Sequence, residues 1–282
     1  MNIHSYMCCQ VANTYSQMGV FMSHQKLVTA SAVLFVFMLA WSVGLAKPLI
    51  NWLDPASEMN RYLINKGVLS AVFGLVFWYA GLYAAIGFRR GRGAGSSVSS
   101  LIIGLPLFAL GIFAFLEPGR ASLSAMELMG WTVVVLLVAF TEEGLFRGVI
   151  FEALSEAGLW RRAILTSFLF GLFHFITAGL GDFGWDISAV YGLSAKWFGL
   201  IFAAMRERAG SIWTVIFAHI VFDVVAISGA GDVETLLEPG LETYIRFLTA
   251  ATVFSLWGFA SLYIIGRRKG DVGKETLQVG AR

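Results

Sequence analysis

The stretch Trp131-Thr-Val-Val-Val-Leu-Leu-Val-Ala-Phe140 leads directly into Thr141-Glu142-Glu143-Gly144-Leu145-Phe146-Arg147. The first ten residues are apolar apart from Thr132, and they predict the end of a membrane-spanning helix. Two adjacent carboxylates then follow, with an arginine four residues after the second. Ionisable side chains at membrane depth are costly, so they usually mark a functional site. Glu142 and Glu143 are therefore the first candidate functional residues.

The composition is that of a membrane protein. Of the 282 residues, 57% are hydrophobic and only 13% are charged, and the mean hydropathy is +0.74. Soluble domains carry about 25% charged residues, so we predict an integral membrane protein. Five prolines and no long polar run leave no room for a separate soluble domain. The net charge of +2 is small. We therefore expect the protein to interact with the lipid bilayer and not with nucleic acid.

Apolar runs predict how often the chain crosses the bilayer. Compared with a span of about 20 residues, they give eight candidates. These lie near residues 27–46, 67–88, 100–116, 124–143, 162–178, 188–205, 211–229 and 243–266. We therefore predict an all-α polytopic membrane protein with about eight transmembrane helices. The region 144–162 is predicted to form a short amphipathic helix between two of them.

The basic residues predict the orientation. With eight spans, most lysines and arginines fall on the side that carries both termini, whereas Lys66 falls on the other side. The positive-inside rule then places both termini in the cytoplasm, and the membrane is the plasma membrane if the cell is bacterial. Glu142 and Glu143 lie at the cytoplasmic end of the fourth predicted span. We therefore expect the helices to enclose a cytoplasm-facing cavity.

Two more polar motifs interrupt apolar helices. His174 ends the segment Phe170-Gly-Leu-Phe-His174, and His219 begins the segment His219-Ile-Val-Phe-Asp223. His219 and Asp223, at positions i and i+4, share a helical face and can pair. His174 taken alone would more often be a packed, hydrogen-bonded residue. Glutamates, histidines and an aspartate together in lipid-spanning helices indicate hydrolytic chemistry inside a membrane.

Glu142 and Glu143 are predicted to have different tasks. Adjacent residues point about 100° apart on a helix, so the two carboxylates need not serve one purpose. Glu143 and Arg147, at i and i+4, can pair on one face. We assign Glu142 to activating water as a general base, and Glu143 with Arg147 to holding the geometry. The alternative is a surface ion pair at the end of a helix.

Together the three motifs resemble those of the CPBP family, the CAAX-processing type II endopeptidases and their bacteriocin-processing relatives. The family's signatures are Glu-Glu-x-x-x-Arg, Phe-x-x-x-His and His-x-x-x-Asn/Asp. They stand here, in order, as Glu142-Glu143-Gly-Leu-Phe-Arg147, Phe170-Gly-Leu-Phe-His174 and His219-Ile-Val-Phe-Asp223. The resemblance covers roughly residues 125–230, and the N-terminal spans match only in being membrane helices.

The resemblance and the predicted spans imply a domain organisation. A cytoplasmic N-terminal tail covers residues 1–26, N-terminal membrane helices 27–123, a CPBP-type catalytic core 124–230, a last membrane helix 231–266, and a basic cytoplasmic tail 267–282. The chemistry is expected in the catalytic core, because all three motifs lie there.

The resemblance implies an intramembrane endopeptidase that hydrolyses a peptide bond of a membrane-associated protein or peptide. Glu142 and His174 would then act on water, while His219 and Asp223 would face the developing oxyanion. Asparagine is commoner at the position of Asp223, and an ionised aspartate cannot donate a hydrogen bond. Asp223 would therefore be protonated, orient His219, or ligate a metal. Two possibilities stay open. The site holds a divalent metal such as zinc through His174, His219, Asp223 and Glu142, or it contains no cofactor.

Other interpretations explain less of the sequence. Gly179-Leu-Gly-Asp182 resembles a motif of intramembrane aspartyl proteases, but the chain has no Tyr-Asp pair. Gly192-Leu-Ser194 resembles the rhomboid serine motif, but it leaves Glu142 and Glu143 unexplained. The sequence contains no His-Glu-x-x-His. The main alternative is a non-proteolytic membrane protein, such as a transporter, an immunity factor or a scaffold, that uses the same residues to bind an ion or a partner.

Overall fold

The computed structural model describes residues 24–55, 57–88, 91–116, 123–180, 184–229 and 241–279, and these form helices joined by short connections. The longer helices are α2 (His24–Ala40), α3 (Ala46–Leu53), α4 (Glu58–Tyr79), α6 (Ala94–Ile103), α7 (Leu105–Leu116), α8 (Ala125–Glu143), α10 (Gly158–Gly179), α11 (Trp185–Ala209), α12 (Trp213–Gly229) and α14 (Leu241–Val279). The short elements are α5 (Leu82–Ala85), α9 (Phe151–Ala153) and the 3-10 turn η3 (Ser155–Ala157). Two π-helical segments, η1 (Trp41–Leu45) and η2 (Gly144–Ile150), continue α2 and α8. The predicted all-α class is confirmed.

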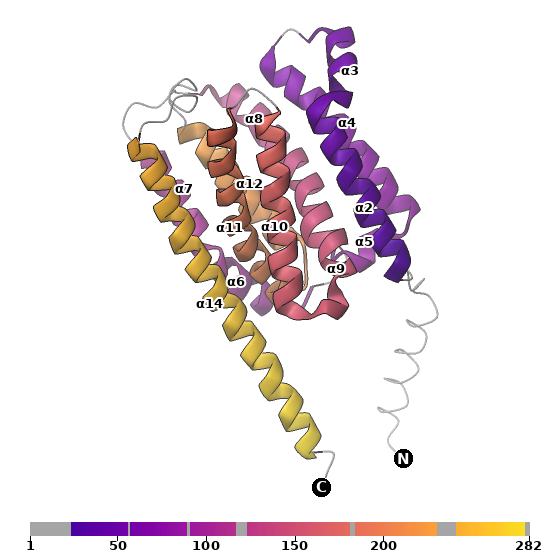
Figure 1. Ribbon diagram of the computed structural model, residues 1–282, viewed down its shortest axis with the longest axis vertical. Helices are drawn as coiled ribbons and strands as arrows, with labels where there is room; N and C mark the ends of the chain where they lie inside the picture. Colours follow the sequence, from indigo (N-terminus) through magenta and orange to yellow (C-terminus); the bar gives the residue numbers. More distant parts are fainter. Residues whose placement is uncertain are drawn as a thin grey trace.

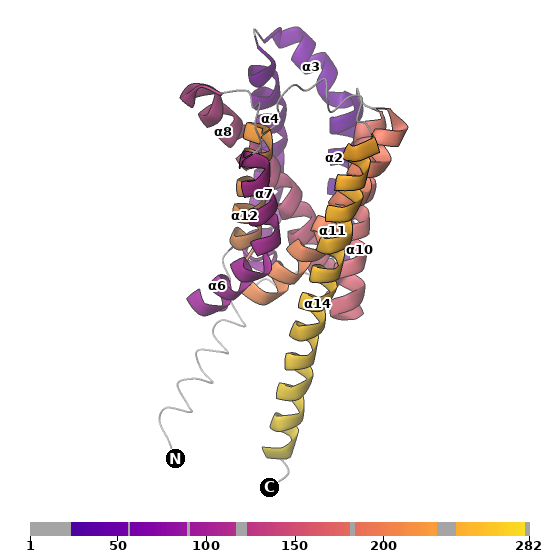
Figure 2. The same cartoon turned by 90° about the vertical axis from the view of Figure 1, so that its left-hand side faces the viewer.

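The long helices stand side by side, and successive ones run in opposite directions (Figure 1). α2 begins and α14 ends at the lower end of Figure 1, where α14 extends beyond the other helices. Figure 2 shows two layers, with α4, α7, α8 and α12 in one and α2, α10, α11 and α14 in the other. The π-helical segment η2 contacts α2, α8, α10 and α11, so it lies where the two layers meet.

Local signals in the sequence explain where several helices begin and end. Ser57 caps α4 by accepting a hydrogen bond from the backbone N–H of Asn60. Ser124 and Glu127 form a reciprocal capping box at the start of α8. α11 ends at Gly210, whose φ of +66° is a left-handed conformation that glycine adopts without steric cost.

Several of the helices are long and apolar enough to cross a membrane. Five qualify, or six if the bent pair α6 and α7 forms one span. The five are His24–Leu53, Glu58–Tyr79, Ser155–Gly179, Trp185–Ala209 and Leu248–Arg267. The predicted number of eight is therefore not confirmed, although the polytopic membrane class is. α8 and α12 are not among the five; α12 is only 17 residues long, and α8 contains three glutamates.

Two of the predicted boundaries are wrong. The second span was expected at 67–88, but α4 covers Glu58–Tyr79, because its polar first turns lower the hydropathy without ending the helix. The region 144–162 does not form an amphipathic helix. It begins with the wholly buried segment η2, continues through short turns, and enters α10 at Gly158. The burial of Arg147 within η2 could not be read from hydropathy, since the rings of Phe170 and Phe202 that pack on it lie on α10 and α11.

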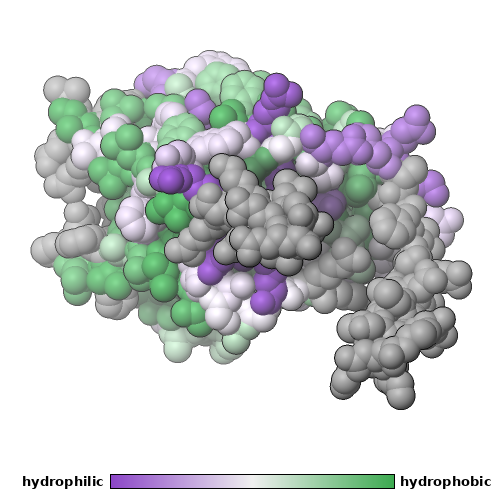
Figure 3. Space-filling view, turned by 90° about the horizontal axis from the view of Figure 1, so that it is seen from below, coloured by the Kyte–Doolittle hydropathy of each residue, from purple (hydrophilic) through white to green (hydrophobic). Residues whose placement is uncertain are grey.

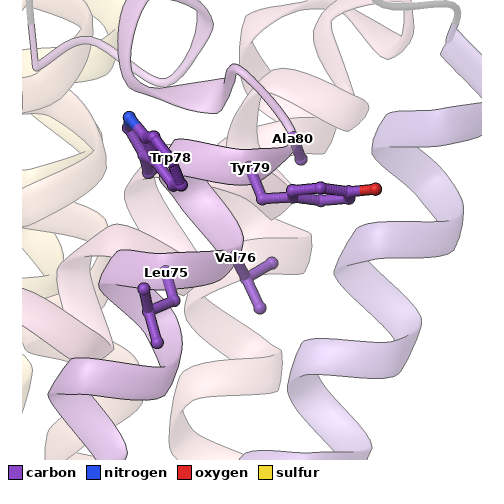
Figure 4. A pocket seen from close by; sticks show the side chains of 5 residues that line it. All are labelled: Leu75, Val76, Trp78, Tyr79 and Ala80. Carbon is purple, nitrogen blue, oxygen red and sulfur yellow. The ribbon is translucent and has the colours of Figure 1, made fainter.

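The outer surface is that of a protein in lipid. Large apolar side chains are exposed along several helices, among them Val36 on α2, Trp78 on α4 and Leu256 on α14. At the lower end of α4, the side chains of residues 75, 76 and 78–80 line a small apolar pocket (Figure 4). The lower face carries hydrophilic side chains beside apolar ones (Figure 3). This distribution is expected where helices leave the hydrocarbon for the headgroup region.

Candidate active site

The structure brings the polar residues of the three motifs into one cluster between the two layers. They are Glu142 and Glu143 at the end of α8, Arg147 in η2, His174 on α10, and His219 and Asp223 on α12. The i and i+4 spacings explain the pairs within one helix, and the packing of α12 against α8 and of η2 against α10 supplies the rest.

Glu142 lies at the centre of this cluster. Its Oε2 atom is buried and has no hydrogen-bond partner among the described residues. The same atom lies 3.8 Å from Nε2 of His174 and 4.0 Å from Nε2 of His219. A buried carboxylate oxygen is normally satisfied, so an unpartnered one needs an explanation, such as a catalytic role or a water molecule that it accepts from.

His174 is held in one orientation by its own helix. Its Nδ1 atom lies 2.9 Å from the backbone carbonyl oxygen of Phe170. A carbonyl only accepts hydrogen bonds, so Nδ1 carries the hydrogen and Nε2 of the neutral ring is an acceptor. That acceptor faces Glu142. Two hydrogen-bond acceptors thus point at one another across a gap.

His219 is held by carboxylates on both ring nitrogens. Nδ1 lies 2.8 Å from Oε1 of Glu143, and Nε2 lies 3.2 Å from Oδ2 of Asp223. The ring also stacks on Phe202, with centroids 5.5 Å apart and an angle of 15° between the planes. With an acceptor at each nitrogen, the ring is arranged to donate from both. Its orientation is therefore fixed from three sides.

Arg147 is completely buried, although it is the most polar residue of the cluster. Its Nη1 atom lies 3.4 Å from Glu143, and its guanidinium group lies 4.1 Å from the ring centre of Phe170 and 5.3 Å from that of Phe202. Gly199 on α11 makes room for it, because a Cβ atom there would lie 2.9 Å from Nη2. Ion pairing and cation–π contacts offset part of the cost of burying this charge, while Nε and Nη2 have no hydrogen-bond partner among the described residues.

The π-helical segment η2 sets the position of Arg147. Short π-helical stretches are rare and often lie at functional sites. The widened turn is supported from α11, where Nε of Arg206 donates a hydrogen bond to the backbone oxygen of Arg147 over 3.1 Å. It is also packed closely from α4, since a Cβ atom on Gly144 would lie 2.9 Å from the ring of Phe77.

A second polar layer lies below the cluster. Glu207 on α11 is buried and forms ion pairs with Arg92 and with Arg162 of α10. Together with Arg206, these residues tie α10, α11 and the start of α6 to the underside of η2. Residues 141–151 are accordingly buried without exception.

The accessible atoms of the cluster lie on the side away from this second polar layer. The side chains of His174 and Asp223 are 28% and 31% exposed, and residues 174–180 above the site are partly or fully exposed. The accessible side chains of the cluster therefore lie away from the end that carries the start of α2 and the end of α14. If that end is cytoplasmic, as the basic residues predict, the accessible side of the cluster does not face the cytoplasm, so the predicted cytoplasm-facing cavity and the predicted orientation are alternatives.

Sequence reasoning missed Lys66, which it placed on the far side of the membrane. Lys66 lies within α4, on the helical face whose residues Leu69, Ser70 and Phe73 are buried, and it interacts electrostatically with Glu142. The signal that could have found it is the i, i+3, i+4, i+7 spacing with those three residues. The predicted start of the second span at residue 67 excluded it by one position.

The predicted metal ligands are His174, His219, Asp223 and Glu142, and a dependence on metal stays a prediction. Within the described ranges, no group of three or more histidine, cysteine, aspartate and glutamate side chains is arranged to hold an ion. One reason is that both nitrogens of His219 already face carboxylates at 2.8 and 3.2 Å.

The alternative motifs are not supported by contacts. Asp182 lies outside the described residues. Ser194 is buried, and the bonds of His219 in the described part of the chain go to Glu143 and Asp223 rather than to that hydroxyl. A serine activated by His219 is therefore not what the structure contains.

Comparison with known proteins gives a result that agrees with the geometry. No curated protein matches the chain. Residues 124–225 match the family described as type II CAAX prenyl endopeptidase, Rce1-like. This range begins at the N-cap of α8 and ends on α12, two residues beyond Asp223, so it contains every motif residue of the cluster. Over residues 124–225, this multi-pass membrane protein is therefore similar to the Rce1-like, type II CAAX prenyl endopeptidase family.

Proposed function

We propose that the chain is an intramembrane endopeptidase that hydrolyses a peptide bond of a membrane-associated protein or peptide with water activated by Glu142. The observation that carries the proposal is the unpartnered Oε2 of Glu142, 3.8 Å from Nε2 of His174. Two acceptors at this separation can each take one hydrogen of a single water molecule at about 2.8 Å. The oxygen lone pair of that water then points away from both of them.

This arrangement also determines the path of the proton during the reaction. As the water oxygen bonds to the carbonyl carbon of the substrate, Glu142 takes one of its protons. When the tetrahedral intermediate collapses, the carbon–nitrogen bond breaks and Glu142 passes the proton to the leaving amine. His174 accepts the second hydrogen bond of the water throughout and so aligns the attack. A positioned general base of this kind contributes about 10²–10⁴-fold to the rate.

His219 is the group that we assign to the developing oxyanion. Its Nε2 atom lies 4.0 Å from Glu142 and faces Asp223, whose side chain is partly exposed. An N–H donor stabilises negative charge that appears only in the transition state. Asp223, 3.2 Å from the same nitrogen, orients the ring, and Glu143 fixes it from the opposite nitrogen. Arg147 neutralises Glu143, so the ring is held by a buried ion pair.

Asp223→Asn separates this mechanism from a metal-dependent one. An asparagine can still accept a hydrogen bond from His219 and also gains a donor for the oxyanion, so we expect activity within about threefold of wild type or higher. Chelators should have no effect. The measurement is cleavage by the purified variant with and without chelator, together with the metal content of the wild type. An inactive variant combined with stoichiometric zinc in the wild type would establish a metalloprotease instead.

We also propose that both termini are cytoplasmic, because the basic residues gather at that end of the bundle. Gly95, at the start of α6, and Glu58, at the start of α4, are exposed at opposite ends. A membrane-impermeant thiol reagent should label Gly95→Cys only from the cytoplasmic side and Glu58→Cys only from the outside. The background is a chain in which Cys8 and Cys9 are replaced by serine. The reverse pattern would invert the protein in the membrane, and labelling of both positions from one side would contradict the alternating arrangement.

A further inference from the structure

Lys66 is a charged residue of the membrane interior that the proposed mechanism does not use. Its side chain is partly buried in α4, and in the described part of the chain it forms no hydrogen bond or ion pair. The charge that acts on it is that of Glu142. An ammonium group at this depth is costly, and such residues are functional by default. The structure therefore raises the question of which anion Lys66 binds.

The packing of α4 on α8 gives the distance from Lys66 to the centre of the cluster. The two helices run in the same direction, since Met59 lies against Gly130 and Phe77 against Gly144. Ser70 fixes the register through its hydrogen bond to the backbone oxygen of Leu137 at 3.1 Å. Lys66 lies one turn before Ser70, and Glu142 lies five residues after Leu137. At about 1.5 Å per residue, the two side chains start roughly 13 Å apart along the helix axes.

We propose that Lys66 binds the free C-terminal carboxylate of the substrate peptide. This inference rests on the proposed function, because it needs a scissile bond at Glu142. A CAAX sequence is by definition the last four residues of a protein. A cut inside it leaves the C-terminal carboxylate at most three residues from the scissile bond, or about 10 Å in an extended chain. The spacing of roughly 13 Å is measured along the helix axes. The lysine and glutamate side chains extend from those axes, so the distance between their charged groups can match the length of about 10 Å of the peptide.

The energetics favour such a pair. A carboxylate and an ammonium group are each expensive to remove from water, and each offsets the cost of the other when they pair. Lys66 would therefore favour substrates that end within the site. An amidated or extended C-terminus would leave the ammonium group unpaired. The pair also fixes the direction of the peptide, with its C-terminal end toward Lys66 and the upper half of the bundle.

The test compares two peptides on four proteins in liposomes. The peptides are a fluorogenic substrate that ends in S-farnesyl-Cys-Val-Leu-Ser and the same peptide with a C-terminal amide. The proteins are the wild type, Lys66→Met, Lys66→Arg and Lys196→Met, the last being a matched control on α11. Lys196 is also partly buried, and it lies over the ring of Trp197 at 4.5 Å.

We expect the wild type and Lys196→Met to show a KM about 10- to 100-fold lower for the carboxylate than for the amide, as for a hydrogen bond between charged groups. Lys66→Met should bring this ratio within about twofold of one by raising the KM of the carboxylate peptide alone, and Lys66→Arg should restore it. A fall in kcat that is equal for both peptides in Lys66→Met would mean that Lys66 acts through Glu142. That result would overturn the proposal.

A second measurement does not depend on cleavage. The tripeptide Val-Leu-Ser should raise the unfolding temperature of the wild-type protein, whereas its amide should not, and Lys66→Met should abolish the difference. If the wild type cleaves neither peptide, cleavage of CAAX-type substrates is refuted, yet this binding measurement still decides the role of Lys66. Equal shifts by the tripeptide and its amide, or no shift with either, would overturn that role.

Discussion

Glu142→Gln is expected to lower kcat by about 10²–10⁴-fold without affecting folding or expression. The substitution is nearly isosteric, and the oxygen that it replaces forms no hydrogen bond whose loss would destabilise the fold. An amide cannot take the proton of the attacking water, so the chemical step loses its base while the substrate still binds. KM should therefore change little. The measurement is steady-state cleavage of a CAAX-type peptide by purified protein in liposomes.

Glu156→Gln is the matched control for this substitution. Glu156 lies in η3, exposed and outside the cluster, so its loss of charge should leave kcat unchanged. Cleavage by Glu142→Gln within about threefold of wild type would remove Glu142 from the mechanism. It would favour the non-proteolytic alternative if the cleavage seen with the wild type proved to come from a contaminating protease.

Arg147→Met is expected to lower the free energy of unfolding by about 3–5 kcal/mol and to abolish cleavage. The substitution keeps an apolar side chain between Phe170 and Phe202 but leaves the charge of Glu143 buried and unpaired. That charge would then be balanced only by His219, whose orientation it controls at 2.8 Å. Both stability and oxyanion stabilisation therefore depend on one ion pair.

The double variant Glu143→Gln, Arg147→Met tests this explanation. Removing both charges removes the unpaired one, so the double variant should be more stable than Arg147→Met alone, although still inactive. Unfolding in detergent, followed by a fluorescence signal, measures the difference. Arg161→Met, an exposed arginine on α10, should change the stability by less than about 0.5 kcal/mol. A loss below about 1 kcal/mol in Arg147→Met would show that the pair is not structural.

The sequence alone predicted the members of the cluster because polar residues are conspicuous in apolar helices. Glu143 with Arg147 and His219 with Asp223 follow from a spacing of four residues, which is a property of one helix. The bond from His219 to Glu143 joins residues 76 positions apart and depends on how α12 packs against α8. No periodicity within a helix contains that information.

The errors have physical causes of the same kind. Hydropathy measures what a segment would expose on its own, so it ended the second span at the wrong residues and left Lys66 outside it. It also could not predict that η2 is π-helical and buried, since the contacts that bury Arg147 come from α10 and α11. The roles of the individual residues and the dependence on metal stay predictions for the experiments above.

The charged residues of α8 and α12 have a consequence for biosynthesis. α8 carries Glu142 and Glu143 and α12 carries Asp223, and neither helix is among the five that are long and apolar enough to cross a membrane. Each charged side chain adds about 2.5–3.5 kcal/mol to the insertion of an isolated helix by the translocon. We therefore expect these two helices to enter the bilayer together with neighbours that shield their charges. The proposed active site is then expected to assemble late, and newly inserted chains to be inactive until it does.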